Sequence, residues 1–139
     1  MWAVYAGLSA LFAAATAILL KLGLKDASVS ASLANAIRII PALLAAWIIV
    51  AFTGQYKEIS GITPKIFLWL ILSGLATGLS WLFYTKAIQM GEVSKVAPID
   101  KLSVVITMLL AFVILGETPD FKTLLAGALI TAGTFVLIM

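Results

Sequence analysis

Long apolar runs separated by short polar joints make up nearly the whole chain. Five of these runs are long enough for a helix that crosses a bilayer, which needs about 20 apolar residues. They cover approximately residues 2–24, 30–52, 64–90, 94–115 and 119–139. A soluble chain of 139 residues that is 63% hydrophobic and 11% charged could not bury its apolar surface. The sequence therefore predicts an all-α integral membrane protein, a single five-helix domain over residues 1–139.

Local signals mark the ends of several predicted helices. Thr63 followed by Pro64 is a hydroxyl cap with a proline in the first helical turn, and Thr118 with Pro119 repeats that pattern. Gly116 is expected to end the fourth helix. No basic residue precedes the first run, so we expect it to be a retained helix and not a cleavable signal peptide. The joint before the second helix contains Lys25, Asp26 and Ser28, polar residues that can cap the N-terminus of that helix.

The residue types that are missing exclude several kinds of chemistry. The chain has no cysteine and no histidine, so it has no thiolate nucleophile, disulfide, haem ligand or imidazole acid–base group. No catalytic carboxylate pair is visible, and we predict neither an enzyme nor any cofactor or metal site. The net charge of +3 is spread singly between apolar runs, which argues against binding to nucleic acid.

The basic residues are divided almost evenly between the two predicted membrane faces. Five helices place the two termini on opposite sides. One face receives Lys57, Lys65 and Lys122, and the other receives Lys21, Lys25, Lys95 and, nearby, Lys86. Such a chain could insert in both orientations, and two oppositely inserted copies would form an inverted repeat of the kind found in transporters. Alternatively, a few further residues or a partner protein fix one orientation.

Three segments in the second half of the chain carry a resemblance to a known family. They are GLATGLSWLFYTKAIQMG at 74–91, APIDKLSVVITMLLAFVILGET at 97–118 and GALITAG at 127–133. With IRIIPALLAAW in the second run, the whole chain resembles the EamA family of the drug/metabolite transporter superfamily. It is most similar to short members that have a single five-helix unit.

This resemblance implies the architecture of a working assembly. We expect an antiparallel homodimer, or a pair with a related, oppositely inserted subunit. The first four helices of each unit would line a central cavity, and the fifth would lie mainly at the pairing interface. The expected location is the cytoplasmic membrane of a prokaryote. Residues 2–20 lack the acidic residue that small multidrug resistance proteins use for proton-coupled export, so that mechanism does not transfer.

Three ionisable residues within the apolar runs are the leading candidates for a site: Arg38, Asp100 and Lys101. A charge near the middle of a membrane helix costs about 2.5–3.5 kcal/mol and usually faces protein or water. Arg38 shares a helix face with Asn35 and several alanines, so we expect it to point into the protein. It would then bind an anion, act in gating, or form a structural pair with Asp100.

Polar residues at helical spacing extend this candidate cavity. Asp100 lines up with Ser103 and Thr107, and Pro98 either bends the helix beside them or is an ordinary first-turn proline. The other predicted cavity residues are Asn35, Trp81, Tyr84, Tyr5 and Ser9. The hydroxyl groups could equally bond between helices. Residues expected in helix packing or dimer contact are Gly74, Gly78, Gly127, Thr131 and Gly133.

Together these features favour a secondary transporter of small polar metabolites that works by alternating access. Arg38, Lys101 and Asp100 leave a surplus of one positive charge, which favours an anionic or zwitterionic substrate. Two alternatives stay open: a flipper of lipid-linked groups, and a membrane subunit that pairs with another protein without transporting anything. A channel is disfavoured, because no filter repeat or ring of charges is present.

Overall fold

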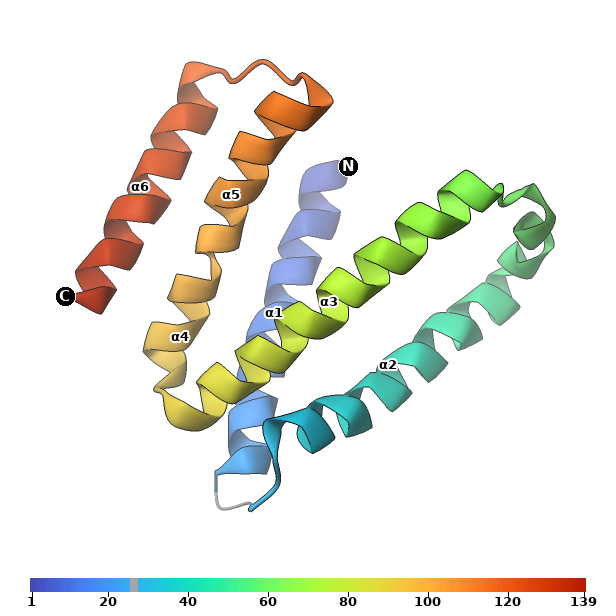
Figure 1. The fold of residues 1–139 in the computed structure, drawn as a ribbon, viewed down its shortest axis with the longest axis horizontal. Coiled ribbons are helices and arrows are strands. Elements are labelled where there is room, and N and C mark those ends of the chain that lie inside the picture. The colour runs from blue at the N-terminus through green and yellow to red at the C-terminus, as the bar shows by residue number, and fades with distance from the viewer. Residues whose placement is uncertain (26–27) are drawn as a thin grey trace. The chain divides into compact units, whose positions relative to one another are not determined.

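The computed structural model describes residues 1–25 and 28–139, and all regular secondary structure of the described residues is helical (Figure 1). Five segments are long and apolar enough to cross a membrane, which confirms the predicted all-α membrane architecture. Asp26, one of the predicted capping residues, lies outside the described residues.

The described residues form six α-helices and two shorter helical segments of other types, one of which, η1, lies between two membrane segments. In chain order they are α1 (Trp2–Leu24), α2 (Ala31–Thr53), the 3₁₀ segment η1 (Gln55–Gly61), α3 (Pro64–Met90), α4 (Val93–Asp100), α5 (Leu102–Leu110), the π-helical segment η2 (Ala111–Leu115) and α6 (Phe121–Ile138). The fourth membrane segment, Val93–Leu115, consists of α4, α5 and η2.

Side-chain caps begin three of these helices. The Thr63 hydroxyl accepts a hydrogen bond from the backbone N–H of Ile66 at 3.3 Å, which confirms the predicted start of α3. For α2 the cap is Ser30 and not Ser28, because the Ser30 hydroxyl accepts from the N–H of Leu33 at 3.3 Å. Such a cap is worth about 1 kcal/mol.

The start of α6 corrects a prediction. The cap is Asp120 and not Thr118, so the helix begins at Phe121, after Pro119. A carboxylate oxygen of Asp120 accepts a hydrogen bond from the N–H of Thr123 at 2.8 Å. A carboxylate is favoured over a hydroxyl here because its negative charge faces the positive end of the helix dipole.

The fourth membrane segment is interrupted near its polar residues. Pro98 lies beyond the first turn of α4 and has no N–H to donate to the carbonyl of Ser94. Lys101 separates α4 from α5, and its N–H donates to the carbonyl of Pro98, three residues back, at 3.0 Å. Of the two expectations for Pro98, the interruption agrees with a break beside Asp100 and not with a first-turn proline. The segment ends as expected at Gly116, whose φ of +70° is the left-handed conformation that favours glycine.

The described chain divides into two compact units. One contains residues 1–21 and 90–139, and the other contains residues 22–89. In the first unit, α6 runs alongside α4 and α5 (Figure 1). Gly127 of α6 is buried, and a Cβ at this position would lie 3.4 Å from the Sδ atom of Met108. The missing side chain therefore lets α5 and α6 approach closely.

The second unit is a helical hairpin. Helices α2 and α3 are joined by η1, and the side-chain amide of Gln89 donates to the carbonyl of Val29 at 2.8 Å. This bond ties the last turn of α3 to the residue just before the Ser30 cap. Its buried residues, Asn35, Thr85 and Ile88, all lie in the half of the hairpin that contains this bond.

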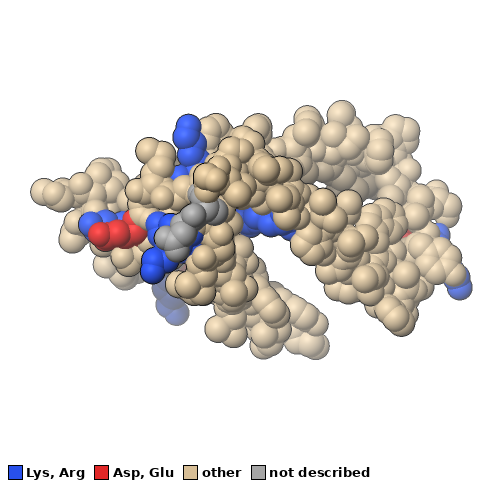
Figure 2. All heavy atoms as spheres, turned by 90° about the horizontal axis from the view of Figure 1, so that it is seen from below, with Lys and Arg blue, Asp and Glu red and all other residues tan. Residues whose placement is uncertain are grey.

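Most apolar side chains of the described chain are exposed, as a membrane protein requires. Among apolar side chains of the described residues, only those of Ala17 and Ile88 are buried. Most atoms visible in Figure 2 belong to uncharged residues. Lipid tails are as apolar as these side chains, so helix association depends on close packing and interhelical hydrogen bonds more than on apolar burial.

Candidate functional site

A basic and aromatic cluster lies between α2 and α3. The Nη1 atom of Arg38 donates a hydrogen bond to the hydroxyl of Thr85 at 3.2 Å. The guanidinium carbon of Arg38 also lies 5.1 Å from the centre of the Trp81 ring. A cation at that distance from an indole face is stabilised by about 0.5–2 kcal/mol, more where water is excluded. Both contacts hold the guanidinium in one orientation.

The local sequence explains how these side chains meet. Trp81 and Thr85 are four residues apart on α3, so they present one face to α2. The Ser30 cap fixes the start of α2, and the Gln89 bond to Val29 holds that start against the end of α3. Arg38, two turns further along α2, is thereby placed opposite Trp81 and Thr85.

The polar residue Asn35 of α2 is almost completely buried. It lies one turn before Arg38 on α2, and only 7% of its surface is exposed. Its Oδ1 atom has no hydrogen-bond partner among the described residues. Tyr84 also lies near the Arg38 guanidinium. The hairpin thus places Trp81, Thr85 and Tyr84 near the Arg38 guanidinium, with Asn35 one turn away on α2.

The other two predicted charges lie in the other unit. A carboxylate oxygen of Asp100 and the ammonium nitrogen of Lys101 form an ion pair at 3.6 Å, at the break between α4 and α5. The Lys101 side chain is exposed, and that of Asp100 is about one-third exposed. Because Arg38 and Asp100 belong to different units, the pairing of these two residues stays a prediction.

Two threonine hydroxyls, one of them in the predicted row of Asp100, Ser103 and Thr107, bond to carbonyls of their own helices. The Thr107 hydroxyl donates to the carbonyl of Ser103 at 2.8 Å, and the Thr77 hydroxyl donates to that of Ser73 at 2.9 Å. Each hydroxyl keeps an acceptor lone pair that a solute could use. Tyr5 and Ser9 are exposed on α1. Their predicted role in lining a cavity stays a prediction.

The small residues predicted to pack helices differ in their surroundings. Gly127 packs against Met108 within its own unit, and the hydroxyl of Thr131 donates to the Gly127 carbonyl at 2.8 Å. In contrast, a Cβ at Gly74, Gly78 or Gly133 would meet nothing within 4 Å. These three positions leave open faces to which another helix could pack.

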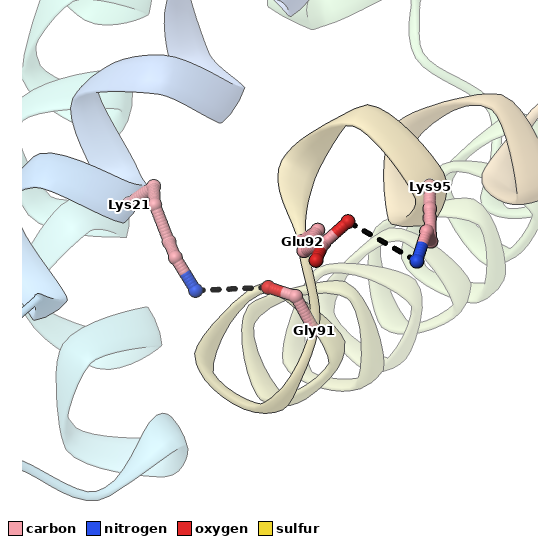
Figure 3. A network of polar contacts seen from close by, with 4 residues as sticks. All are labelled: Lys21, Gly91, Glu92 and Lys95. Carbon is pink, nitrogen blue, oxygen red and sulfur yellow. Dashed lines mark hydrogen bonds and ion pairs between the residues drawn. The ribbon is translucent and has the colours of Figure 1, made fainter.

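Sequence reasoning missed two side chains that join helices. Thr85 was not among the candidates, although its spacing of four from Trp81 would have placed it on the same face. Lys21 of α1 donates to the carbonyl of Gly91 at 2.8 Å, directly before an ion pair of 3.2 Å between Glu92 and Lys95 (Figure 3). The sequence carries no local signal for this long-range bond, which holds α1 against the start of α4.

Comparisons with known proteins give a matching family and a similar protein. The profile of the EamA-like transporter family matches residues 1–139. A Sinorhizobium protein named "Uncharacterized transporter in cobO 3'region" is 42% identical over 136 residues, which are 98% of this chain and 95% of that protein. No solved structure matches the chain significantly.

Proposed function

The chain belongs to the EamA-like transporter family, and from this premise we propose that it moves small anionic or zwitterionic metabolites across the membrane by alternating access. A membrane transporter is supported by the family and by the relative's name. The proposed substrate class depends on one observation: a guanidinium held between two membrane helices by Trp81 and Thr85. Arginine binds carboxylates and phosphates through planar paired hydrogen bonds, and it repels cations.

The remaining charges support the same substrate class. Asp100 and Lys101 neutralise each other as an ion pair, so Arg38 supplies the surplus positive charge. Their position at a helix break resembles the interrupted helices that many transporters place at the substrate site. Trp81, Tyr84, Asn35, Ser103 and Thr107 would set the shape of the cavity, with Tyr5 and Ser9 on its wall.

We further propose that the working unit is an antiparallel homodimer in the cytoplasmic membrane of a prokaryote. Five helices are half of a ten-helix inverted repeat, and the nearly even distribution of lysines would let copies insert in both senses. The open faces at Gly74, Gly78 and Gly133 offer surfaces for close helix pairing. A related, oppositely inserted subunit could take the place of the second copy.

The proposal can be tested by measuring uptake of radiolabelled carboxylates, amino acids and sugar phosphates into proteoliposomes. Arg38→Ala should lower the transport of the best substrate by about tenfold to a hundredfold, the loss expected for a charge-assisted hydrogen bond of about 1.5–3 kcal/mol. Asp100→Asn should also lower transport while the protein still inserts and dimerises. Lys86→Ala, which removes an exposed cation from α3, is the matched control and should keep the wild-type rate.

Two results would contradict the proposal. One is transport at the wild-type rate by both Arg38→Ala and Asp100→Asn. The other is the absence of any movement of anions or zwitterions, combined with purification of a second protein in equal amount, which would favour a non-transporting subunit.

A further inference from the structure

The amide oxygen of the Asn35 side chain is a hydrogen-bond acceptor without a donor in the described chain. This Oδ1 atom is buried and has no partner among the described residues. A buried amide oxygen without a donor is costly, more so where surrounding lipid and protein lower the dielectric constant. Native proteins contain few such groups, and each one calls for an explanation, such as a functional role, a bound water or an ion.

Arg38, one helical turn away, has hydrogen-bond donors without acceptors in the described part of the chain. One N–H of its guanidinium donates to Thr85 and its central carbon lies over the Trp81 ring, so both contacts direct the group toward α3. Its other N–H groups have no hydrogen-bond partner within residues 1–25 and 28–139. Arg38 therefore offers donors for an anion, whereas Asn35, about 5–6 Å away at the Cβ atoms for a spacing of three, offers an acceptor.

One ligand can pair with both Arg38 and Asn35 if it has an anionic group and a hydrogen-bond donor on neighbouring atoms. A bare anion would satisfy Arg38 and leave Asn35 unpaired, and a simple cation would be repelled by the guanidinium. We infer that the substrate is a carboxylate with an adjacent amino or hydroxyl group, whose carboxylate binds Arg38 and whose donor binds the Oδ1 atom of Asn35. This inference rests on the proposed transport function and narrows its substrate class.

The test compares ligands that differ only in the donor. Lactate and alanine each have a donor next to the carboxylate, and propionate has none. Replacing Trp2, Trp47 and Trp69 with Phe leaves Trp81, which lies against Arg38, as the only tryptophan and as a fluorescent reporter. In nanodiscs, lactate and alanine should bind at least about tenfold more tightly than propionate, because propionate leaves the acceptor unpaired.

Two variants assign the effect to its residues. Asn35→Leu should lower the affinity for lactate to that for propionate and leave propionate unchanged. Arg38→Gln should weaken binding of all three ligands. Thermal unfolding of each variant in the same nanodiscs checks that the variant is folded. If a variant does not fold, the comparison of the three ligands on the protein that keeps Asn35 and Arg38 still tests the inference.

Equal binding of lactate and propionate would overturn the inference, since water would then satisfy Asn35 as well as a ligand does. So would a preference for lactate that persists in Asn35→Leu, or the binding of none of the three ligands. The proposed function fails separately, when no anion or zwitterion of the wider panel shows transport that depends on Arg38.

Discussion

Asp120 shows how a single residue outside the membrane can make one helix depend on pH. Hydrogen bonds from the side chain and the backbone N–H of Thr123 hold the pKa of the Asp120 carboxyl below its usual range. A group whose pKa is lowered by folding contributes stability above its unfolded pKa, and loses that contribution as the pH falls through the folded pKa. The start of α6 should therefore weaken in acid.

Asp120→Asn separates this effect from the titration of the other carboxylates. Asparagine caps helices about as well as aspartate but does not titrate. Below pH about 4, where an aspartate in an unfolded chain protonates, the wild type should lose more thermal stability than the variant does. Unfolding curves in detergent from pH 7 downward measure the difference, and parallel curves for the two proteins would contradict the assignment.

The candidate site was only partly predictable from residue types. Arg38 stands out because a charge within an apolar run must face protein or water, and its contacts with Trp81 and Thr85 agree with the predicted direction. Thr85 does not stand out, since a threonine in a membrane helix can satisfy its hydroxyl on its own backbone, as Thr107 does. Which hydroxyl meets the arginine depends on how two helices are placed.

The presence of each membrane helix was easier to predict than the residues where it begins and ends or the helices against which it packs. Apolar length alone identifies all five membrane segments. The boundary at Thr63 follows a local rule, but at α6 a stronger cap two residues later prevails over Thr118. Partners could not be predicted, because lipid removes the apolar pattern that distinguishes inner from outer faces in soluble proteins.

The packing of α5 against α6 predicts how a larger side chain at Gly127 changes the stability of the chain. Gly127→Leu should destabilise the chain by about 1–3 kcal/mol, because the added side chain would meet Met108 at once. Gly133→Leu is the matched control on the same helix, where a Cβ meets nothing within 4 Å. Unfolding in a detergent series compares the two, and equal stability would show that α5 and α6 do not depend on the gap at Gly127.

For Gly133→Leu the expected loss is in pairing and not in folding. If two copies pair through the open face at this position, the variant should unfold like the wild type but dissociate at a lower detergent-to-protein ratio. Cross-linking at increasing detergent-to-protein ratios measures that dissociation. A dimer of unchanged strength would place the pairing surface elsewhere.

The charge distribution of the whole molecule bears on how two copies could complete a transporter. Lysines near the ends of the membrane segments divide almost evenly between the two faces, so the positive-inside rule gives little preference for either orientation. Since segments alternate in direction, the joint at η1 and the residue Met139 lie on opposite faces of any one copy. Labelling at each of these two positions therefore gives a separate measurement of how the chain is oriented in the membrane.

Because the chain has no cysteine, a single Cys can be read without background. We expect Ser60→Cys, which retains Lys57, and a Cys at Met139 each to react partly from outside intact cells, with the remainder reacting only after the cells are opened. Gln55→Lys and Glu58→Lys in the Ser60→Cys background should then draw η1 to the cytoplasmic side and abolish outside labelling. One-sided labelling at both positions, opposite in sense, would contradict dual insertion. The second half of the inverted repeat would then have to be a different, oppositely inserted subunit, and transport assays would need both chains.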